Sequence, residues 1–202
     1  RSTLFPYTTL FRSLAEKRTI RKEVLSRRKT LPKKEWVERS AIIADRVVHG
    51  IDRMATARHV FLYLCITSSR EVCTGELAAT LAGSARSLSV PIVREGRLFA
   101  AKYVPGEPLG RGLFGQPEPV SVRPVEAATI DVAILPLVAV DQKGCRLGYG
   151  KGYFDRFLAS LAAAGNEPCR IGLAFSLQIV PSLPCDRWDE PLDSAKDRKS
   201  VV

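Results

Sequence analysis

The sequence predicts one α/β domain with a largely parallel β-sheet. The chain has 202 residues, 46% of them apolar, which is enough to bury one core of good size. Short apolar runs alternate with helical segments, an order that is typical of parallel sheets. One run, His59–Leu64 (HVFLYL), is continuously apolar, as expected of a parallel strand buried on both faces. The composition excludes a disordered chain, a collagen-like repeat and a coiled coil, and no apolar run approaches the ~20 residues of a transmembrane helix.

The first elements are expected to be two helices. Leu14–Lys29 places apolar residues among many cations, which predicts a basic amphipathic helix. A break follows at 30–32, because Pro32 suits the first turn of a second helix. Gly50 is a plausible end for that helix. Its predicted buried face consists of Val37, Ala41, Ala44, Val47 and Val48.

The elements that follow alternate between strand and helix. The Gly- and Pro-rich stretch Pro105–Pro119 is predicted to be a long loop, and such loops in compact domains are usually functional. The strongest predicted strand is Asp131–Val140 (DVAILPLVAV). After His59–Leu64, the other expected elements are a helix over Thr74–Leu81, strands over Leu88–Val93 and Arg97–Val104, a helix over Tyr153–Ala164 and a strand over Cys169–Phe175.

The two ends of the chain look foreign to the domain. Leu4–Ser13 can be back-translated to a common sequencing adaptor, and 197–202 to the reverse complement of the same DNA, followed by a stop codon. We therefore expect a single domain over 14–196, with adaptor-derived tails at 1–13 and 197–202. Leaving out the charged tail residues lowers the formal net charge of +10 by three.

Charge and cysteine content narrow the class of protein. The five cysteines are odd in number and form no CxxC pair, so we expect neither a disulfide framework nor a zinc knuckle, and a reducing cytoplasm. The basic balance suits either nucleic acid or a polyanionic small molecule.

The segment Asp141–Asp155 (DQKGCRLGYGKGYFD) carries most of the chemical information. It lies between the strongest strand and a helix, and ligands of parallel sheets bind beyond the carboxyl ends of strands. Gly148, Gly150 and Gly152 alternate, which lets backbone N–H groups approach an anion. The following helix adds its positive N-terminal end.

Side chains of the same turn match a phosphate-bearing ligand. Arg146 supplies a planar cation and Lys151 a mobile one. Asp155 could reach a magnesium ion carried by phosphates, and Tyr153 and Phe154 offer ring faces to a planar heterocycle. The turn is neither a Walker A motif nor a dinucleotide fingerprint, and a tight turn with solvated charges is the structural alternative.

This turn resembles the signature of the 5-formyltetrahydrofolate cyclo-ligase (methenyltetrahydrofolate synthetase) family. Four further segments match that family in order, so the resemblance covers nearly all of 14–193. They are Lys17–Arg21 (KRTIR), Glu71-Val72, Phe114–Pro119 (FGQPEP) and Trp188–Asp193 (WDEPLD), with Leu135-Pro136 and Asp141 preceding the turn itself.

The resemblance implies a fold and a reaction. The fold would be a three-layer αβα sandwich of the Rossmann-like, sugar-phosphate isomerase and CoA-transferase-like type. The formyl oxygen of 5-formyltetrahydrofolate would attack the γ-phosphate of ATP, and N10 would then displace phosphate to give 5,10-methenyltetrahydrofolate. The implied enzyme is a cytoplasmic monomer that needs Mg²⁺ and takes a folate, polyglutamylated or not, with neither nucleic acid nor membrane as a partner.

The resemblance also implies roles for particular residues. Arg146 and Lys151 would be catalytic, and Asp155 and Asp189 would hold Mg²⁺. ATP contacts would come from Lys17, Arg18, Thr19, Ile20, Arg21, Arg146, Leu147, Gly148, Tyr149, Gly150, Lys151, Gly152, Tyr153 and Phe154. Folate contacts would come from Ile66, Glu71, Phe114, Tyr149, Gly150, Lys151, Gly152 and Tyr153.

Structural alternatives exist for several of these residues. Lys17 and Arg21 could belong to a solvated basic helix, and Glu71 could be an acid at a helix start. Asp189 competes with three nearby acids: Asp186, Glu190 and Asp193.

Two departures from the family pattern stand out near the C-terminal end. Trp188 replaces the usual histidine. The strand that normally follows Asp193 is missing, which should expose a sheet edge.

Two other functions remain open from the residues alone. A nucleic-acid-binding protein would need basic stripes interleaved with aromatic residues or a helix that reads a groove, and neither is found. A sugar-phosphate isomerase or CoA-transferase-like enzyme would need an active-site carboxylate and a phosphate loop, but no ATP.

Overall fold

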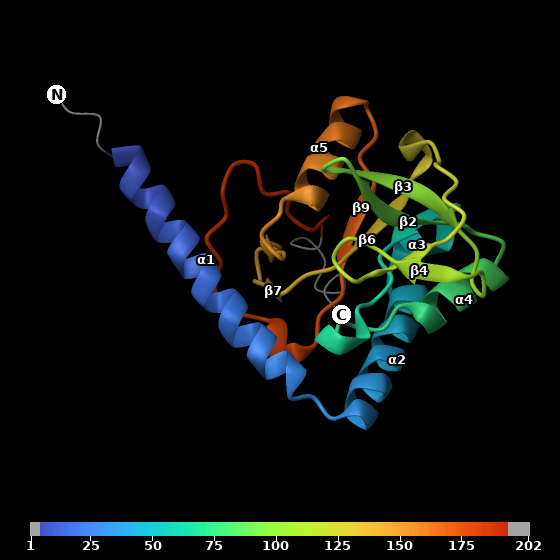
Figure 1. The fold of residues 1–202 in the computed structure, drawn as a ribbon, viewed down its shortest axis with the longest axis horizontal. Helices are drawn as coiled ribbons and strands as arrows, with labels where there is room; N and C mark the ends of the chain where they lie inside the picture. The colour runs from blue at the N-terminus through green and yellow to red at the C-terminus, as the bar shows by residue number, and fades with distance from the viewer. Residues whose placement is uncertain (1–4, 194–202) are drawn as a thin grey trace.

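A five-stranded sheet forms the centre of the computed structural model, which describes residues 5–193 (Figure 1). Its strand order is β3-β2-β1-β6-β9, and every neighbouring pair is parallel except β2 and β3. The largely parallel sheet is therefore confirmed. The strands span His59–Leu62 (β1), Ser87–Arg94 (β2), Arg97–Tyr103 (β3), Val132–Leu135 (β6) and Cys169–Gly172 (β9).

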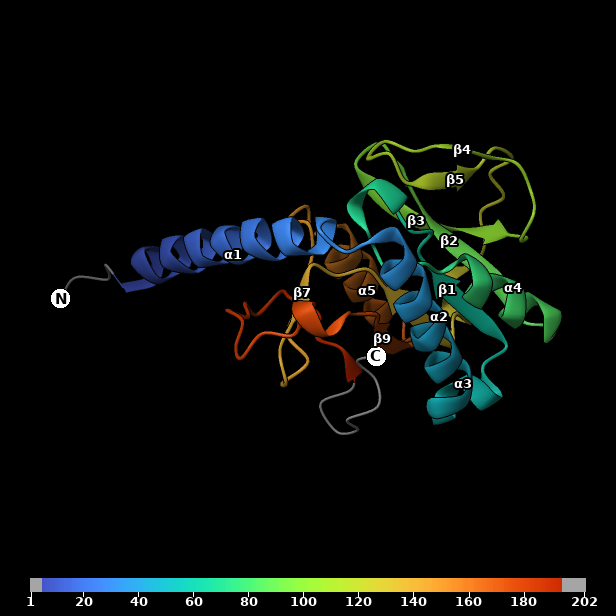
Figure 2. The same cartoon turned by 90° about the horizontal axis from the view of Figure 1, so that it is seen from below.

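The sheet is covered on both faces, because successive side chains of a strand point to opposite sides. Val60 and Leu62 of β1 pack in one cluster with α2 (Lys33–Gly50), α3 (Asp52–Thr56) and α4 (Gly75–Gly83). Phe61 points the other way, into a cluster with α5 (Tyr153–Ala163). Figure 2 shows α2, α3 and α4 together on one side of the sheet. The result is the three-layer αβα sandwich that the family resemblance implied.

The first helix lies beside these layers. α1 spans Phe5–Lys29, so it begins well before the predicted Leu14. Its Val24 packs against Val138, Leu147 and Leu183, a small cluster separate from the two main ones. Among the described residues, no helix has the length and apolar character needed to cross a membrane.

The predicted buried face of α2 is confirmed at Ala44 and Val47 and wrong at Val37. Val37 is 44% exposed, and the stripe at 36, 40, 43, 44 and 47 is buried instead. This stripe follows the helical i, i+4, i+7 spacing and brings Trp36 into the core. Its indole N–H donates to the backbone oxygen of Glu71 over 2.6 Å, so a polar partner fixes which face turns inward.

The strongest predicted strand is divided in two. β6 stops at Leu135 because Pro136 has no N–H to donate to a sheet. The chain then leaves the main sheet, and β7 (Ala139–Val140) pairs antiparallel with β8 (Arg146–Leu147).

The remaining differences concern short elements. The predicted loop Pro105–Pro119 holds an antiparallel ribbon of β4 (Leu109–Arg111) and β5 (Pro117–Pro119). The α3 helix and three 3₁₀ turns, Thr67–Ser69, Ala127–Thr129 and Ser176–Gln178, were not predicted. Within the described residues, β9 pairs with β6 alone. Of the predicted tails at 1–13 and 197–202, residues 1–4 and the whole of 197–202 lie outside the described residues, and residues 5–13 belong to α1.

Candidate active site

A cavity of about 870 Å³ opens at the carboxyl ends of β1 and β6. Tyr63, Leu64 and Ile66 line it just after β1, and Pro136 lines it just after β6. Further parts of the wall come from the glycine-rich turn, the tip of the β4–β5 ribbon, the loop over 186–190, one face of α1, and residues of β2 and β3. Segments far apart in the sequence therefore meet where parallel sheets bind ligands.

The glycine-rich turn presents its backbone to this cavity. Gly150 has φ +87° and Gly152 has φ +64°, a conformation that side-chain-bearing residues rarely adopt. A Cβ on Gly150 would lie 3.2 Å from Arg21 Cζ, so the close approach of this guanidinium also requires glycine. In the described part of the chain, the amide groups of 149–152 donate to no protein group. Such amides at the start of α5 are suited to receive phosphate oxygens.

Arg146 is a buried cation beside the turn. Its Nη2 lies 2.6 Å from Asp155 Oδ1, and its side chain is only 2% exposed. Burial lowers the pKa of Arg146, while the nearby Asp155, Asp189 and Glu190 carboxylates oppose this effect. Its Nε is buried and has no hydrogen-bond partner among the described residues. An oxygen-rich ligand would supply the missing acceptor.

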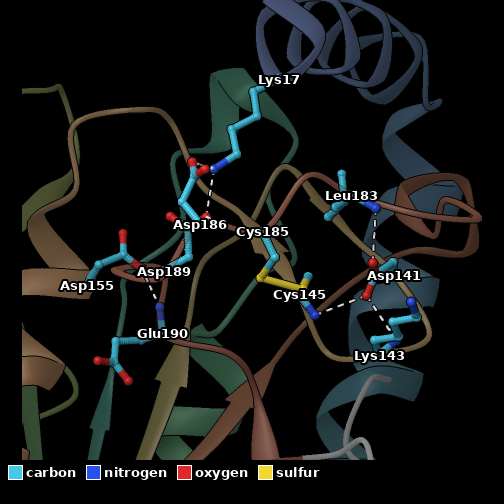
Figure 3. Close-up of a disulfide and its surroundings, with 10 residues drawn as sticks. All are labelled: Lys17, Asp141, Lys143, Cys145, Asp155, Leu183, Cys185, Asp186, Asp189 and Glu190. Atoms are coloured by element: carbon cyan, nitrogen blue, oxygen red, sulfur yellow. Dashed lines mark hydrogen bonds and ion pairs between the residues drawn. A yellow bond between two sulfur atoms is a disulfide. The ribbon is translucent and has the colours of Figure 1, made fainter. Parts of the chain in front are cut away.

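Lys17 is held by two aspartates (Figure 3). Its Nζ lies 2.7 Å from Asp186 Oδ2 and 2.6 Å from Asp189 Oδ2, and its side chain is 7% exposed. Burial works to lower the pKa of Lys17, but the hydrogen bonds and negative charges of the two aspartates together raise it. The ammonium is therefore charged and fixed at the cavity wall.

Arg21 projects from the same face of α1, one turn further on. Its Nε donates to the backbone oxygen of Gly148 over 2.8 Å, which ties the helix to the glycine-rich turn. The structure does not bring Arg18, Thr19 or Ile20 to the cavity. Lys17 and Arg21 share one face of the helix. Arg18 and Thr19 are exposed to solvent, and Ile20 packs in the small cluster around Val24.

Glu71 lies in a buried polar network on the opposite side of the cavity. Its Oε2 accepts the amide of Ile66 over 2.6 Å, and its Oε1 accepts the hydroxyl of Tyr149. Burial raises the pKa of Glu71 despite the opposing hydrogen bonds from Ile66 and Tyr149. The carboxylate thus holds the strand-following loop and the glycine-rich turn together.

Arg28 completes this network and was missed by the sequence analysis. Its guanidinium donates to Tyr149 Oη at 2.6 Å, to the Ser69 oxygen at 2.8 Å and to the Leu137 oxygen at 3.1 Å. It is 1% exposed, a rare position for arginine. One signal could have found it: positions 17, 21 and 28 are spaced by four and seven and therefore share one face of a helix.

Aromatic rings lie at the mouth of the cavity. The rings of Phe114 and Tyr153 are 5.5 Å apart, and the Arg156 guanidinium lies 5.0 Å from the centre of the Tyr153 ring. Lys151 is exposed on the same rim, and Trp188 is 54% exposed. Of the other predicted residues, Ile66, Leu147 and Phe154 also line the cavity.

The two predicted Mg²⁺ ligands lie on neighbouring segments. The Glu190 amide donates to Asp155 Oδ1 over 3.3 Å, which places Asp155 next to the chain that follows Asp189 (Figure 3). Residues 5–193 contain no cluster of three or more histidine, cysteine or acidic side chains that could hold a metal. Mg²⁺ usually binds one or two carboxylates together with substrate phosphates, so two aspartates beside the glycine-rich turn fit that ion.

A disulfide joins two parts of the wall and corrects the expectation from cysteine content. Cys145 and Cys185 are bonded to each other (Figure 3). Cys145 immediately precedes Arg146, and Cys185 immediately precedes Asp186. The spacing of 40 residues gave no sign of this pairing, because only the fold brings the two segments together.

Comparison with known proteins relates the whole described domain to one family. The 5-formyltetrahydrofolate cyclo-ligase family model matches residues 13–196. The 5-formyltetrahydrofolate cyclo-ligase of Haemophilus influenzae is 32% identical over 143 residues, covering 67% of this chain and 73% of that protein. The Escherichia coli protein of the same name is 34% identical over 127 residues, covering 60% of this chain and 69% of its own.

Solved structures of methenyltetrahydrofolate synthetases also resemble this chain. The Aquifex aeolicus 5,10-methenyltetrahydrofolate synthetase is 31% identical and superposes with a TM-score of 0.74, covering 88% of this chain and 87% of that one. The Mycoplasma pneumoniae 5,10-methenyltetrahydrofolate synthetase, at 24% identity and a TM-score of 0.70, shares the fold and covers 88% of this chain and 96% of its own.

Proposed function

Because this chain belongs to the 5-formyltetrahydrofolate cyclo-ligase family, we propose that it closes the formyl group of 5-formyltetrahydrofolate onto N10 in an ATP-dependent reaction. The products would be 5,10-methenyltetrahydrofolate, ADP and phosphate. One observation carries the proposal for this chain: cationic side chains, unpaired backbone amides and a buried carboxylate converge on one cavity. The cations and amides suit phosphates, and the carboxylate side suits the N–H-rich edge of a pterin.

The side chains around the cavity divide into two groups. Arg146, Lys151 and Arg21 would neutralise phosphate charge, and the amides of 149–152 would fix the phosphate oxygens. Bound ATP would supply the phosphoryl group that activates the formyl oxygen, and Mg²⁺ at Asp155 and Asp189 would offset its charge. The chain itself then works by position and electrostatics, without a covalent nucleophile.

The folate would occupy the other half of the cavity. Glu71 and the amide of Ile66 lie at its inner end, and Phe114 and Tyr153 form its mouth. An aromatic ring of the folate could stack against either side chain at the mouth. Tyr149 lies between the two halves and is fixed by Glu71 and Arg28.

The test is the absorbance of methenyltetrahydrofolate after mixing the full chain with 5-formyltetrahydrofolate and Mg-ATP. We expect a signal that requires both ATP and Mg²⁺. Removing a charge that stabilises the transition state costs on the order of 100-fold in kcat, so Lys151→Ala should lower turnover by about that factor. Lys143→Ala, an exposed lysine on the neighbouring turn, is the matched control and should leave turnover unchanged. Folded protein that gives no ATP-dependent signal would contradict the proposal.

The monomeric state, the cytoplasmic location and the lack of nucleic-acid or membrane partners stay predictions. Light scattering of the purified chain tests the first, and cell fractionation of the host tests the second. Sedimentation with DNA, RNA and lipid vesicles tests the third.

A further inference from the structure

Two free cysteines touch each other next to residues that line the cavity: Cys65 lies between Leu64 and Ile66, and Cys73 lies two residues after Glu71. Cys65 follows β1, Cys73 precedes α4, and their Sγ atoms are 3.4 Å apart. Cys65 is 8% exposed and Cys73 is half-buried. A small reagent can therefore reach Cys73, and the sulfur of Cys65 is close enough to react with the sulfur of Cys73.

The surroundings favour a thiolate on Cys73. The thiol of Cys65 donates to the sulfur of Cys73, and the amide of Gly75, in the first turn of α4, does the same. The Cys65 hydrogen bond is the main cause that lowers the pKa of Cys73 to about 6, against burial and the charge of Glu76. The same bond, with burial and the charge of Glu71, raises the pKa of Cys65. Cys73 is thus the more nucleophilic of the two as a thiolate, and Cys65 keeps its proton.

The two cysteines bracket the loop that forms the inner wall. Between them lie Ile66 and Glu71, whose amide and carboxylate bond to each other over 2.6 Å. Glu71 also accepts the hydroxyl of Tyr149 in the glycine-rich turn. A change in the distance between Cys65 and Cys73 would therefore shift Ile66 and Glu71, and through Glu71 also Tyr149, so that both halves of the cavity are affected.

We propose that Cys65 and Cys73 are a redox-active thiol pair, which a peroxide converts into a disulfide that displaces the loop between them. The proposal goes beyond the cyclo-ligase reaction, because that reaction uses neither thiol. A disulfide requires the two sulfurs to move from 3.4 Å to about 2.05 Å apart.

The chemistry is a two-electron oxidation. The Cys73 thiolate attacks one oxygen of hydrogen peroxide, the O–O bond breaks, and with one proton the products are a sulfenic acid and water. The Cys65 sulfur then attacks the Cys73 sulfur, the S–O bond breaks, and the Cys65 proton leaves with the hydroxyl as a second water. The two thiols are oxidised to one disulfide and the peroxide is reduced to two waters.

Tryptic mapping tests the bond without any activity measurement. The full chain is treated with hydrogen peroxide, blocked with N-ethylmaleimide and digested with trypsin without reduction. Because Arg70 lies between the two cysteines, they fall on different peptides, 59–70 and 71–86. We expect a linked pair lighter than the sum of the two peptides by two hydrogen atoms. Cys65→Ser should instead leave a Cys73 sulfenic acid that dimedone labels, and Cys169→Ser, which changes the remaining free cysteine, should still give the linked pair.

Turnover in the same samples tests the coupling to the cavity. A displacement of about 1 Å at a reacting site can cost ~100-fold, so we expect at least about a tenfold loss of kcat/KM, restored by dithiothreitol. Cys73→Ser should keep its turnover after peroxide, which separates this pair from the Cys145–Cys185 disulfide. If Cys73 and Cys169 are labelled equally by N-ethylmaleimide after peroxide treatment and no linked peptide is found, the thiol pair is overturned. If the linked peptide is found but turnover is unchanged, the coupling to the cavity is overturned. The linked peptide is detected by its mass and needs no cyclo-ligase activity. Failure of the proposed function would therefore leave the test of the thiol pair intact.

Discussion

At the scale of single residues, the cavity is built from charges that are buried together with a partner. Arg146 is paired with Asp155, and Lys17 with Asp186 and Asp189. Leaving one member of such a pair alone is costly, because a buried charge without a partner has lost its hydration. Asp155 and Asp189 therefore each have a structural role beside the one expected of them toward Mg²⁺.

Replacing Asp155 separates these two roles. Asp155→Asn keeps the shape but removes the carboxylate that pairs directly with the Arg146 guanidinium, so that only the more distant charges of Asp189 and Glu190 remain. Breaking a fully buried pair costs 3–5 kcal/mol, and since the Asp155 side chain is 25% exposed we expect a loss of about 2–4 kcal/mol in the free energy of unfolding. Urea denaturation measures this, and the exposed Asp52→Asn is the control. If Asp155 also binds Mg²⁺, the Mg²⁺ concentration for half-maximal turnover rises; unchanged stability would contradict the structural role.

Glu71 predicts a pH dependence of stability. Its pKa is raised in the folded protein, mainly by burial, so the folded chain keeps this proton to higher pH than the unfolded chain, where a glutamate titrates near ~4.3. The stability that Glu71 contributes is complete below that value and is lost as the pH rises through the folded pKa. Glu71→Gln cannot ionise and should show a smaller fall in unfolding free energy between about pH 4 and pH 7.

Unfolding in urea at a series of pH values gives this slope for both chains. Glu76 is exposed and lies five residues further on, so Glu76→Gln should show the same change of unfolding free energy with pH as the unsubstituted chain. Equal slopes for Glu71→Gln and the natural chain would show that Glu71 does not carry the effect.

Among the residues of the site, those on one contiguous motif could be predicted from the sequence. Arg146, Gly150 and Lys151 share a single turn, and their types alone indicate a phosphate ligand. Asp186 and Arg28 could not be assigned in this way, because Asp186 pairs with Lys17 across 169 residues and Arg28 bonds to backbone oxygens 41 and 109 residues away. Their roles depend on which segments the fold brings together.

At the scale of elements, α1 fastens the loops around the cavity. Through Arg28 it contacts the loop after β1, the loop after β6 and the glycine-rich turn. Through Arg21 it contacts that turn a second time. The residues alone predicted a basic amphipathic helix, and the family resemblance placed Lys17 and Arg21 at the ATP site. The anchoring of the helix through Arg28 was not predicted, because a basic side chain on a helix is ordinarily solvated.

Arg28→Met tests this fastening. Methionine keeps most of the apolar stem but donates none of the three hydrogen bonds, each worth about 1.5–3 kcal/mol when the donor is charged and not additive. We expect a loss of about 3 kcal/mol or more in unfolding free energy, and a higher KM for folate because Tyr149 and the Ser69 loop lose their anchor. Chemical denaturation and initial rates measure the two effects.

Arg27→Met is the matched control, since Arg27 is exposed on the same helix turn. If both variants behave alike, the contacts of Arg28 do not fasten the loops.

Other elements show why boundaries were harder to predict than types. The five strands of the main sheet and the helices α1, α2, α4 and α5 were predicted in their correct order, because apolar runs and helical spacing are local signals. Pro136 ended β6 early, and the hydrogen bond of the Trp36 indole favours burial of Trp36 rather than Val37 on α2. Both effects depend on a particular atom rather than on a pattern.

At the scale of the whole molecule, the described contacts and the family match concern the same stretch. The family model spans 13–196, and Lys17, Arg21 and Arg28 all follow residue 13. We therefore predict that a chain cut to 14–196 melts at the temperature of the full chain and keeps its ATP-dependent turnover. Calorimetry and the absorbance assay measure these quantities. A lower melting temperature, or loss of turnover, would assign a structural part to the tails.

The docking of α1 has a consequence for the order of folding during synthesis. Lys17 pairs with Asp186 across 169 residues, and Arg28 bonds to Leu137 across 109. α1 is thus made early but its partners are made late, and contacts of such long range are slow to form. A nascent chain can form α1 and the first strands, yet it gains a complete ligand cavity only after residue 189 has left the ribosome.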